Sequence, residues 1–285
     1  MKLGLSTYSL HGQLSSGAMS VPDVIDFAAD HGAVHVEIVP LSYNLTEQPE
    51  LIEQIVTRAR ERGIELSNYA IGANFLTDSD EEYEREIQRV MDEVNIAQQL
   101  GVTLMRHDVA SSPDVSIQHF HQQLNRLASA CRRIADHAQQ YGITTSVENH
   151  GFFIQQADRV QTLIQTVDRP NYKTTLDIGN FLCADENPVA AVAQNLPYAS
   201  MVHVKDFYIR PGYRAPGEGW FTSTAGQYLR GAIIGQGDID MWEVLRIVKH
   251  SGYDGYISVE FEGMENDLLG ARIGLANVQR IWDEV

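Results

Sequence analysis

A glycine that ends a helix, followed at once by an apolar and β-branched run, recurs along this chain of 285 residues. Glycine suits that place because it readily adopts the left-handed conformation in which many helices end. The glycines in this context are Gly32, Gly63, Gly101, Gly142 and Gly252. The first four are spaced by roughly 30 to 40 residues, which is typical of repeated strand–helix units. This recurrence predicts parallel strands covered by helices.

The same alternation extends over the whole chain and gives eight strands and eight helices. We expect strands at residues 2–8, 34–39, 64–71, 102–108, 143–147, 172–178, 200–206 and 255–261. We expect helices at about residues 20–30, 49–62, 78–100, 114–141, 156–167, 188–195, 240–250 and 265–283.

Strands that alternate with helices form a parallel sheet, and eight such units close into a barrel. We therefore predict an α/β fold, a (β/α)8 TIM barrel in which residues 1–285 form a single domain. The alternative is an open doubly wound sheet, whose usual GxGxxG motif does not follow the first strand. Residues 207–239 depart from the repeat because they contain seven glycines and no convincing helix. We interpret this long loop between strands seven and eight as a lid or a subunit contact.

Acidic or imidazole side chains stand at the ends of the last four strands: Glu148, Asp177, His203 and Glu260. Successive strand residues point to opposite faces, and each of these four directly follows an apolar residue. The apolar neighbours are therefore expected to pack outward against helices. The four polar side chains are expected to point inward at the C-terminal mouth, where barrel enzymes place their catalytic groups.

Three carboxylates and one imidazole are donors that Mn²⁺, Mg²⁺, Co²⁺ or Zn²⁺ accept. Without a cation the three carboxylates would repel one another, and at least one would take up a proton. Any one of these residues could instead be a single polar group at a strand end that forms a salt bridge with a nearby lysine or arginine. All four together, on strands five to eight and on one face, predict a divalent metal site.

These residues lie in motifs that resemble the sugar isomerase/epimerase superfamily with a xylose-isomerase-like TIM barrel, which includes ketose 3-epimerases, inosose dehydratases and apurinic endonucleases. The motifs are VENHG at 147–151, LDIGN at 176–180, VHVKD at 202–206, GQGDID at 235–240 and VEFEG at 259–263. The resemblance covers essentially the whole chain. It implies that Glu148, Asp177, His203 and Glu260 bind one metal ion, commonly Mn²⁺, and that the two glutamates also act as acid and base.

The expected enzyme is a metal-dependent sugar isomerase or epimerase of carbohydrate metabolism. It would move a proton next to the carbonyl through a metal-stabilised enediolate. The same intermediate can expel a hydroxyl, so an inosose-type dehydratase is the alternative. A non-catalytic sugar-binding barrel is a third reading. An apurinic endonuclease is disfavoured because Asn180 replaces a histidine of that branch and the net charge of −17 repels DNA.

Six further residues are candidates for contacts with the substrate: Glu37, Arg106, His107, Asn180, Lys205 and Arg210. Lys205 shares the inner face with His203, and a salt bridge to one of the glutamates explains it equally well. Glu37 is expected, by the resemblance, to contact substrate or to orient a metal ligand. Asn180 stands where ketose 3-epimerases usually have a substrate-binding histidine, which leaves the identity of the substrate open.

The expected partner is a small sugar or polyol. The loop after strand eight, EFEGMEND, has four acids and no base, which favours an unphosphorylated substrate. The acidic chain argues against nucleic acid and anionic membranes as partners. Two cysteines outside any metal-binding spacing, and an N-terminus without a long apolar run, indicate a cytoplasmic protein. The resemblance implies a homodimer or a homotetramer, and the sequence leaves the two open.

Overall fold

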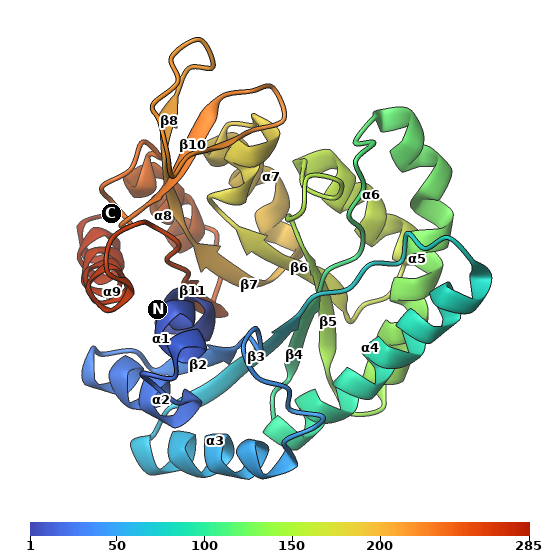
Figure 1. Cartoon of the computed structure of the whole chain (residues 1–285), viewed down its shortest axis with the longest axis horizontal. Coiled ribbons are helices and arrows are strands. Elements are labelled where there is room, and N and C mark those ends of the chain that lie inside the picture. The colour runs from blue at the N-terminus through green and yellow to red at the C-terminus, as the bar shows by residue number, and fades with distance from the viewer.

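Eight parallel strands close into one barrel in the computed structural model, which describes residues 1–285 (Figure 1). Each barrel strand pairs with the next one along the chain, and β11 closes the ring against β1. The barrel strands are β1 (Lys2–Ser6), β2 (His35–Ile38), β3 (Glu65–Ile71), β4 (Leu104–His107), β5 (Thr144–Glu148), β6 (Tyr172–Asp177), β7 (Ala199–Val204) and β11 (Tyr256–Val259). The prediction of a (β/α)8 TIM barrel is confirmed, and the open sheet is excluded.

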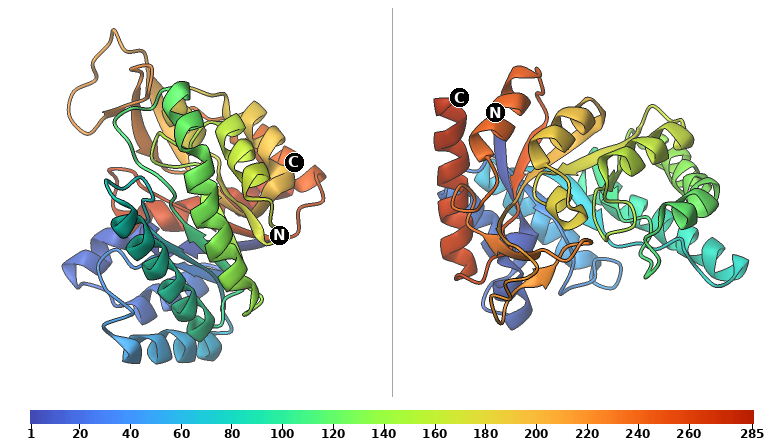
Figure 2. Two further views of the ribbon diagram at one scale, coloured as in Figure 1. Left: turned by 90° about the vertical axis from the view of Figure 1, so that its right-hand side faces the viewer. Right: turned by 90° about the horizontal axis from the view of Figure 1, so that it is seen from above.

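Helices form a continuous outer layer around the barrel, and from α2 to α9 each packs against the next (Figures 1 and 2). The α-helices are α1 (His11–Ser16), α2 (Val21–Asp30), α3 (Pro49–Arg62), α4 (Asp80–Leu100), α5 (Ile117–Gln139), α6 (Ala157–Val167), α7 (Pro188–Asn195), α8 (Met241–His250) and α9 (Asp267–Glu284). Short 3₁₀ helices span Thr7–Leu10 (η1), Asn180–Ala184 (η2) and Leu196–Tyr198 (η3). Helix α1 lies where we predicted a loop. No helix combines the length and the apolar character needed to cross a membrane.

The helix-ending glycines behave as their sequence context predicts. Gly63 and Gly101 cap α3 and α4 with φ angles of 66° and 75°. The N-terminus of α2 carries the expected capping box, in which Ser20 and Asp23 satisfy each other's backbone N–H groups. These local signals fix where the helices end, and so where each following strand enters the barrel.

The inward and outward faces of the strands separate polar from apolar side chains. The outward neighbours of the four metal-site candidates all belong to the main hydrophobic core of 67 buried residues: Val147, Leu176, Val202 and Val259. The inner face carries small polar groups instead, and Ser146 Oγ of β5 lies 2.8 Å from Thr175 Oγ1 of the neighbouring strand β6. The core therefore lies between barrel and helices, which leaves the upper barrel interior free for polar chemistry.

The segment after β7 is more ordered than we predicted. Strand seven was expected at 200–206, but β7 ends at Val204 and a separate antiparallel sheet begins at Asp206. That sheet contains β8 (Asp206–Arg210), β10 (Tyr228–Ala232) and β9 (Phe221–Thr222) in this order. We call residues 206–232 the arm, which projects from the barrel in both figures (Figures 1 and 2). The absence of a helix in this segment was predicted correctly, and the strand pairing was missed.

The base of the arm is fixed by one buried carboxylate. Asp206 accepts hydrogen bonds from the backbone N–H groups of Gly235 and Gly237, each at 2.9 Å. A side chain at position 237 would collide with the Asp206 carboxylate. Glycine in the GQGDID motif is therefore required by a close approach, as a tight turn predicts.

Candidate metal centre

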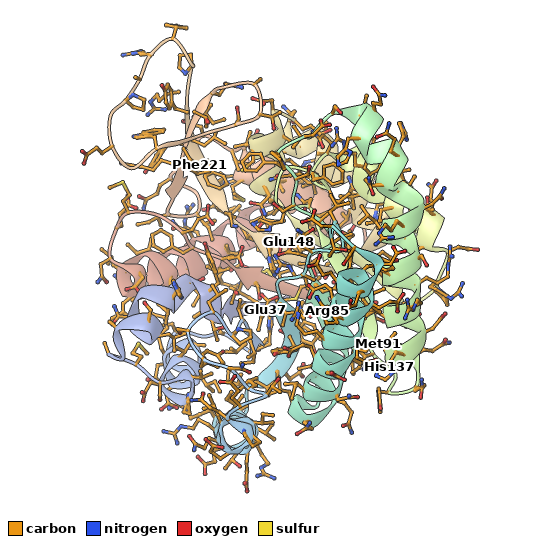
Figure 3. The ribbon with its side chains drawn as sticks, turned by 45° about the vertical axis from the view of Figure 1, so that its right-hand side comes forward. Glu37, Arg85, Met91, His137, Glu148 and Phe221 are labelled. Carbon is orange, nitrogen blue, oxygen red and sulfur yellow. The ribbon has the colours of Figure 1, made fainter.

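Four side chains converge at the C-terminal mouth of the barrel. The potential ligand atoms of Glu148, Asp177, His203 and Glu260 all lie within 4.8 Å of one another. All four residues are buried. Glu148 and Asp177 are the last residues of β5 and β6, and Glu260 directly follows β11. Figure 3 shows Glu148 near the middle of the molecule, inside the ring of helices. The structure thus brings together the four residues that the alternation of side chains along the strands predicted to share the inner face.

The imidazole of His203 has two different sides. Its Nε2 lies 2.9 and 3.1 Å from the two carboxylate oxygens of the fully buried Glu37. Its Nδ1 faces the three other carboxylates at 3.7 to 3.9 Å and has no hydrogen-bond partner. Glu37 therefore orients the ring, as a carboxylate behind a metal-binding histidine does. This is one of the two roles expected for Glu37, which does not line the cavity described below.

Glu148 is held by a buried arginine. Arg106 Nη2 lies 2.6 Å from Glu148 Oε2 and 3.1 Å from Asp108 Oδ1. Burial by itself would raise the pKa of Glu148, but Arg106 and His203 outweigh burial and hold that pKa well below its usual range. The Glu148 carboxylate is thus kept ionised, with the orientation that a metal ligand requires.

Glu260 is paired with Lys205, which realises the salt bridge that the sequence left open. Lys205 Nζ lies 2.8 Å from Glu260 Oε2, 3.2 Å from Glu262 Oε2 and 3.5 Å from Asp177 Oδ2. Burial would raise the pKa of Glu260, but Lys205 and His203 lower it to about 2. Lys205 also lines the cavity, so its ammonium group is available to a ligand.

Two asparagines fix the carboxylates from behind. Asn180 donates its backbone N–H to Asp177 Oδ1 at 2.7 Å and its side-chain amide to Glu148 Oε1 at 3.0 Å. Asn149 exchanges two hydrogen bonds of 2.8 Å with the backbone of Asp177. Asn180, expected to contact substrate, thus lies behind the ligand set, and Asn149 is a positioning residue that we did not single out.

The donor set fits a divalent cation. Asp177 Oδ2 and His203 Nδ1 are buried and have no hydrogen-bond partner, although such atoms are costly to leave unsatisfied. Burial, reinforced by the charges of Glu148 and Glu260, raises the pKa of Asp177 to about 7, so a proton can compensate for missing positive charge. A cation bound by the four side chains would satisfy both atoms and replace that proton. Three carboxylates and one imidazole suit Mn²⁺, Mg²⁺, Co²⁺ or Zn²⁺.

A cavity of about 340 Å³ opens above these residues. Its walls include Glu148, His203, Lys205 and Glu260, and also Arg106. The volume is within the range of small-molecule sites. Of the six candidates for substrate contact, Arg106 and Lys205 line this cavity, whereas Glu37 and Asn180 lie behind its lining.

The remaining two candidates are placed elsewhere. His107 is fully buried, donates a hydrogen bond of 2.8 Å from Nδ1 to the carbonyl of Asp108, and packs edge-on against Phe75. As the residue after the inward-facing Arg106, it points to the helix side of the sheet. Arg210 lies on the arm and pairs with Asp238 at 3.0 Å. Neither side chain lines the cavity.

The structure adds cavity residues that our sequence argument did not use. Glu262 follows Glu260 by two positions and shares its face, so the parity argument already contained its signal. Tyr8 lies beyond the end of β1 and donates a hydrogen bond of 3.3 Å to Glu262. Residues 39–41 and 43–45, which follow β2, also line the cavity, together with Tyr69 of β3 and two side chains of α4.

Comparison with known proteins gives the following matches. A family model described as a xylose isomerase-like TIM barrel matches residues 25–281. An inosose dehydratase of Clostridium botulinum (strain Alaska E43 / Type E3) is 25% identical over 148 residues. That match covers 50% of this chain and 49% of the dehydratase, so it spans about half the length of each protein.

Solved structures reproduce the fold over the whole chain. The probable 3-DHS dehydratase AsbF of Bacillus anthracis has a TM-score of 0.74 at 21% identity, covering 97% of this chain and 99% of its own. A D-tagatose 3-epimerase-like protein has a TM-score of 0.72 at 21% identity, covering 100% of this chain and 99% of its own. At these identities the likeness is one of fold.

Proposed function

The chain belongs to the xylose isomerase-like TIM barrel family, and from that premise we propose that it is a divalent-metal-dependent sugar isomerase or epimerase. The observation that carries the proposal is the pair of glutamates, Glu148 and Glu260, in one cavity on either side of Asp177 and His203. They come from β5 and from the end of β11, which β6 and β7 separate in the barrel. Two carboxylates so placed can serve the two faces of one bound sugar.

The residues that would hold the ion are Glu148, Asp177, His203 and Glu260. A bound divalent ion, Mn²⁺ in our proposal, supplies positive charge to the substrate oxygens when a neighbouring carbon loses its proton. The contribution of the protein is to present ionised carboxylates and a correctly oriented imidazole. Arg106, Glu37 and Asn180 perform that positioning through the contacts described above.

Proton transfer would be carried out by the two glutamates. In an epimerisation one carboxylate would remove the proton from the carbon beside the carbonyl, and the other, after taking up a proton from solvent in the cavity, would deliver it to the opposite face. A substrate oxygen that accepts a hydrogen bond from Lys205 would weaken the 2.8 Å Lys205–Glu260 pair. Glu260 would thereby become a stronger base when substrate is present. Arg106 would contact another substrate oxygen from the β4 side.

The substrate proposed is an unphosphorylated sugar or keto-sugar. The cavity lining holds acids next to its cations, with Asp108, Glu260 and Glu262 close to Arg106 and Lys205. Arg210, which could have reached a phosphate from the loop after β7, is paired with Asp238. The cations that line the cavity, Arg89, Arg106 and Lys205, are each already paired with carboxylates, so a phosphate group would meet repulsion there.

A dehydratase is the second candidate, because the partial curated match is an inosose dehydratase and because Lys205 places an ammonium group beside Glu260. In that reaction Glu260 would take the proton from the carbon next to the ketone. The adjacent C–O bond would break as the leaving hydroxyl takes a proton from Lys205. Water and a carbon–carbon double bond conjugated to the ketone would result, so atoms and charge balance.

Proton NMR in D₂O decides between these reactions. The Mn²⁺-loaded protein is incubated with a pool of ketoses, keto-sugars and inososes, and spectra are recorded after protein and metal are removed. Deuterium next to the carbonyl together with a new isomer or epimer is the expected result. Loss of water with formation of an enone product would show that the protein is a dehydratase and not an isomerase or epimerase. No exchange in any compound, with the metal shown to be bound, would contradict both enzymes and favour a sugar-binding barrel.

A further inference from the structure

Glu262 is a carboxylate of the cavity wall that does not belong to the candidate metal ligands. It lies 3.2 Å from Lys205 Nζ and accepts a hydrogen bond of 3.3 Å from the hydroxyl of Tyr8. Lys205 and Tyr8 also line the cavity. The side chain of Glu262 is 23% exposed, whereas that of Lys205 is 5% exposed. The carboxylate is thus more accessible to a ligand than the lysine with which it pairs.

The arm holds the backbone of Glu262 in place. Gly231 of β10 forms a parallel bridge with Gly263, the residue after Glu262. A Cβ atom at position 231 would lie 2.4 Å from the carbonyl oxygen of Glu262, so a side chain there would force the two segments apart. The base of the arm is itself fixed by Asp206 through two hydrogen bonds. The position of Glu262 therefore depends on a specific contact between the arm and the loop after β11.

Each lysine or arginine of the cavity wall has a carboxylate partner that is not a candidate metal ligand. These pairs are Arg106–Asp108 at 3.1 Å, Lys205–Glu262 at 3.2 Å and Arg89–Glu86 at 2.8 Å. The other carboxylates near Lys205 are Glu260 and Asp177, whose charge a bound metal ion would share. Glu262 would then remain as the acid that neutralises Lys205. An ion pair of this kind offers a donor and an acceptor to a hydroxyl group, but no net positive charge to an anion.

We propose that Glu262 makes the cavity select substrates without a negative charge, because it neutralises Lys205. This inference rests on the proposed function and narrows the substrate class to neutral ketoses or keto-polyols, as opposed to sugar acids. A neutral hydroxyl can accept a hydrogen bond from Lys205 and donate one to Glu262 at the same time. A substrate carboxylate in the same place would gain Lys205 as a partner but would be repelled by Glu262. Such a repulsive group contributes to specificity as much as an attractive one does.

The test compares ketoses with the sugar acids that carry a carboxylate in place of the terminal CH₂OH group: D-fructose with D-fructuronate, and D-tagatose with D-tagaturonate. Saturation-transfer NMR titrations with the Mg²⁺-loaded protein measure the Kd of each compound. Glu262→Gln is expected to lower the ratio of the uronate Kd to the ketose Kd by about tenfold, because Lys205 becomes free to pair with the substrate carboxylate. Glu262→Ala should shift the ratio in the same direction, so the test does not depend on the folding of one variant.

The matched control is Glu265→Gln. Glu265 lies in the same loop and carries the same charge, but it does not line the cavity and lies 3.9 Å from Arg230. Its replacement is expected to leave the Kd ratio within about twofold of that of the unmodified protein, because the charge that it removes is outside the cavity.

Deuterium exchange by the Mn²⁺-loaded protein separates this inference from the proposed function. The kcat/KM of each uronate, relative to its ketose, should rise about tenfold in Glu262→Gln, through a lower KM. If neither uronate binds the two Glu262 variants more tightly, relative to its ketose, than it binds the unmodified protein, the inference is overturned. An equal shift in Glu265→Gln would also overturn it. A shift in the Kd ratio confined to the Glu262 variants, without exchange in any compound, would instead overturn the proposed function and retain Glu262 as the residue that selects neutral ligands.

Discussion

Two buried histidines lie inside the same barrel and have opposite surroundings. His35, in β2 near the bottom, is surrounded by neutral acceptors: its Nδ1 lies 2.9 Å from Ser67 Oγ, and its Nε2 lies 3.2 Å from the carbonyls of Lys2 and Ile257. His203, at the top, faces four carboxylates and has one nitrogen without a hydrogen-bond partner. Both side chains are almost completely buried.

The charge states of the two rings follow from these partners. Burial disfavours the charged form and lowers the pKa of His35 to about 4. Burial acts in the same direction on His203, but Glu37 and Glu260 outweigh it and raise its pKa well above the usual range. A histidine whose nitrogens are both satisfied by neutral groups closes the barrel floor. A histidine among carboxylates with a free nitrogen marks a place that attracts a cation.

The largest difference between the two regions should appear when divalent ions are removed. Chelation is expected to abolish turnover, because only the upper region depends on the ion. It should also lower the melting temperature, since an ion at about 100 times its Kd stabilises the folded state by about 2.7 kcal/mol. Calorimetry with and without Mn²⁺ measures this change, and His203→Gln should show no response to the metal. An equal melting temperature with and without Mn²⁺, together with the absence of metal from the purified protein by elemental analysis, would contradict the proposed metal site.

The acid–base roles should give the next largest effect. Glu148→Gln and Glu260→Gln are expected to lower kcat by about 10² to 10⁴, with smaller changes in KM, because each removes a proton-transferring group. Metal content must be measured in each variant to separate this loss from loss of the ion. Glu65→Gln is the matched control, since Glu65 accepts from Tyr256 away from the cavity. Full activity in either test variant would remove that residue from the proton-transfer step.

The region around His35 should affect how the free energy of unfolding depends on pH, and not how it depends on metal. His35 has its pKa lowered from 6.5 to about 4 on folding, so between these values the unfolded chain binds more protons. The free energy of unfolding should therefore fall as the pH drops from 6.5 towards 4, by roughly 3 kcal/mol for this residue. Urea unfolding in chelator measures the slope, which should be smaller in His35→Gln. The fully buried His107 contributes in the same direction, so some slope should remain. Equal slopes in the two proteins would show that His35 does not stay neutral.

The smallest expected effect comes from the residue behind the upper histidine. Glu37→Gln should weaken metal binding by about 10- to 100-fold, because His203 loses the charge that orients it and raises its basicity. Isothermal titration with Mn²⁺ measures the affinity, again with Glu65→Gln as control. An unchanged Mn²⁺ affinity would mean that Glu37 does not contribute to metal binding and that the other carboxylates orient the His203 ring.

Much of the candidate site could be predicted because it depends on strand parity and on strand ends. Alternation along β5, β6 and β7 places Glu148, Asp177 and His203 on one face regardless of the loops. The same rule carries Glu260 past the end of β11, and it also contained Glu262, which we did not use. By contrast, His107 was chosen because it ends strand four, and Arg210 because the long loop after strand seven could bring it to the substrate, and neither side chain lines the cavity.

Pairings between distant segments were beyond the reach of the sequence pattern. The glycine-rich arm gave no strand signal, yet β10 pairs with β8, and Asp206 fixes the base of the arm through the N–H groups of Gly235 and Gly237. One wall of the cavity likewise depends on how residues 39–41 and 43–45 lie beside the end of β3. Neither arrangement follows from local propensity, since both depend on contacts between residues far apart in the chain.

The sequence by itself determined the barrel and the residues at its mouth, because helix-ending glycines and the two-residue period of strands are local properties of the chain. Only the tertiary structure decided which partners surround each group. The closing of β11 on β1 places carboxylates from three strands around the free nitrogen of His203, and it places neutral carbonyls around His35. Charge state, orientation and cavity shape depend on such neighbours, and a linear pattern contains no record of them.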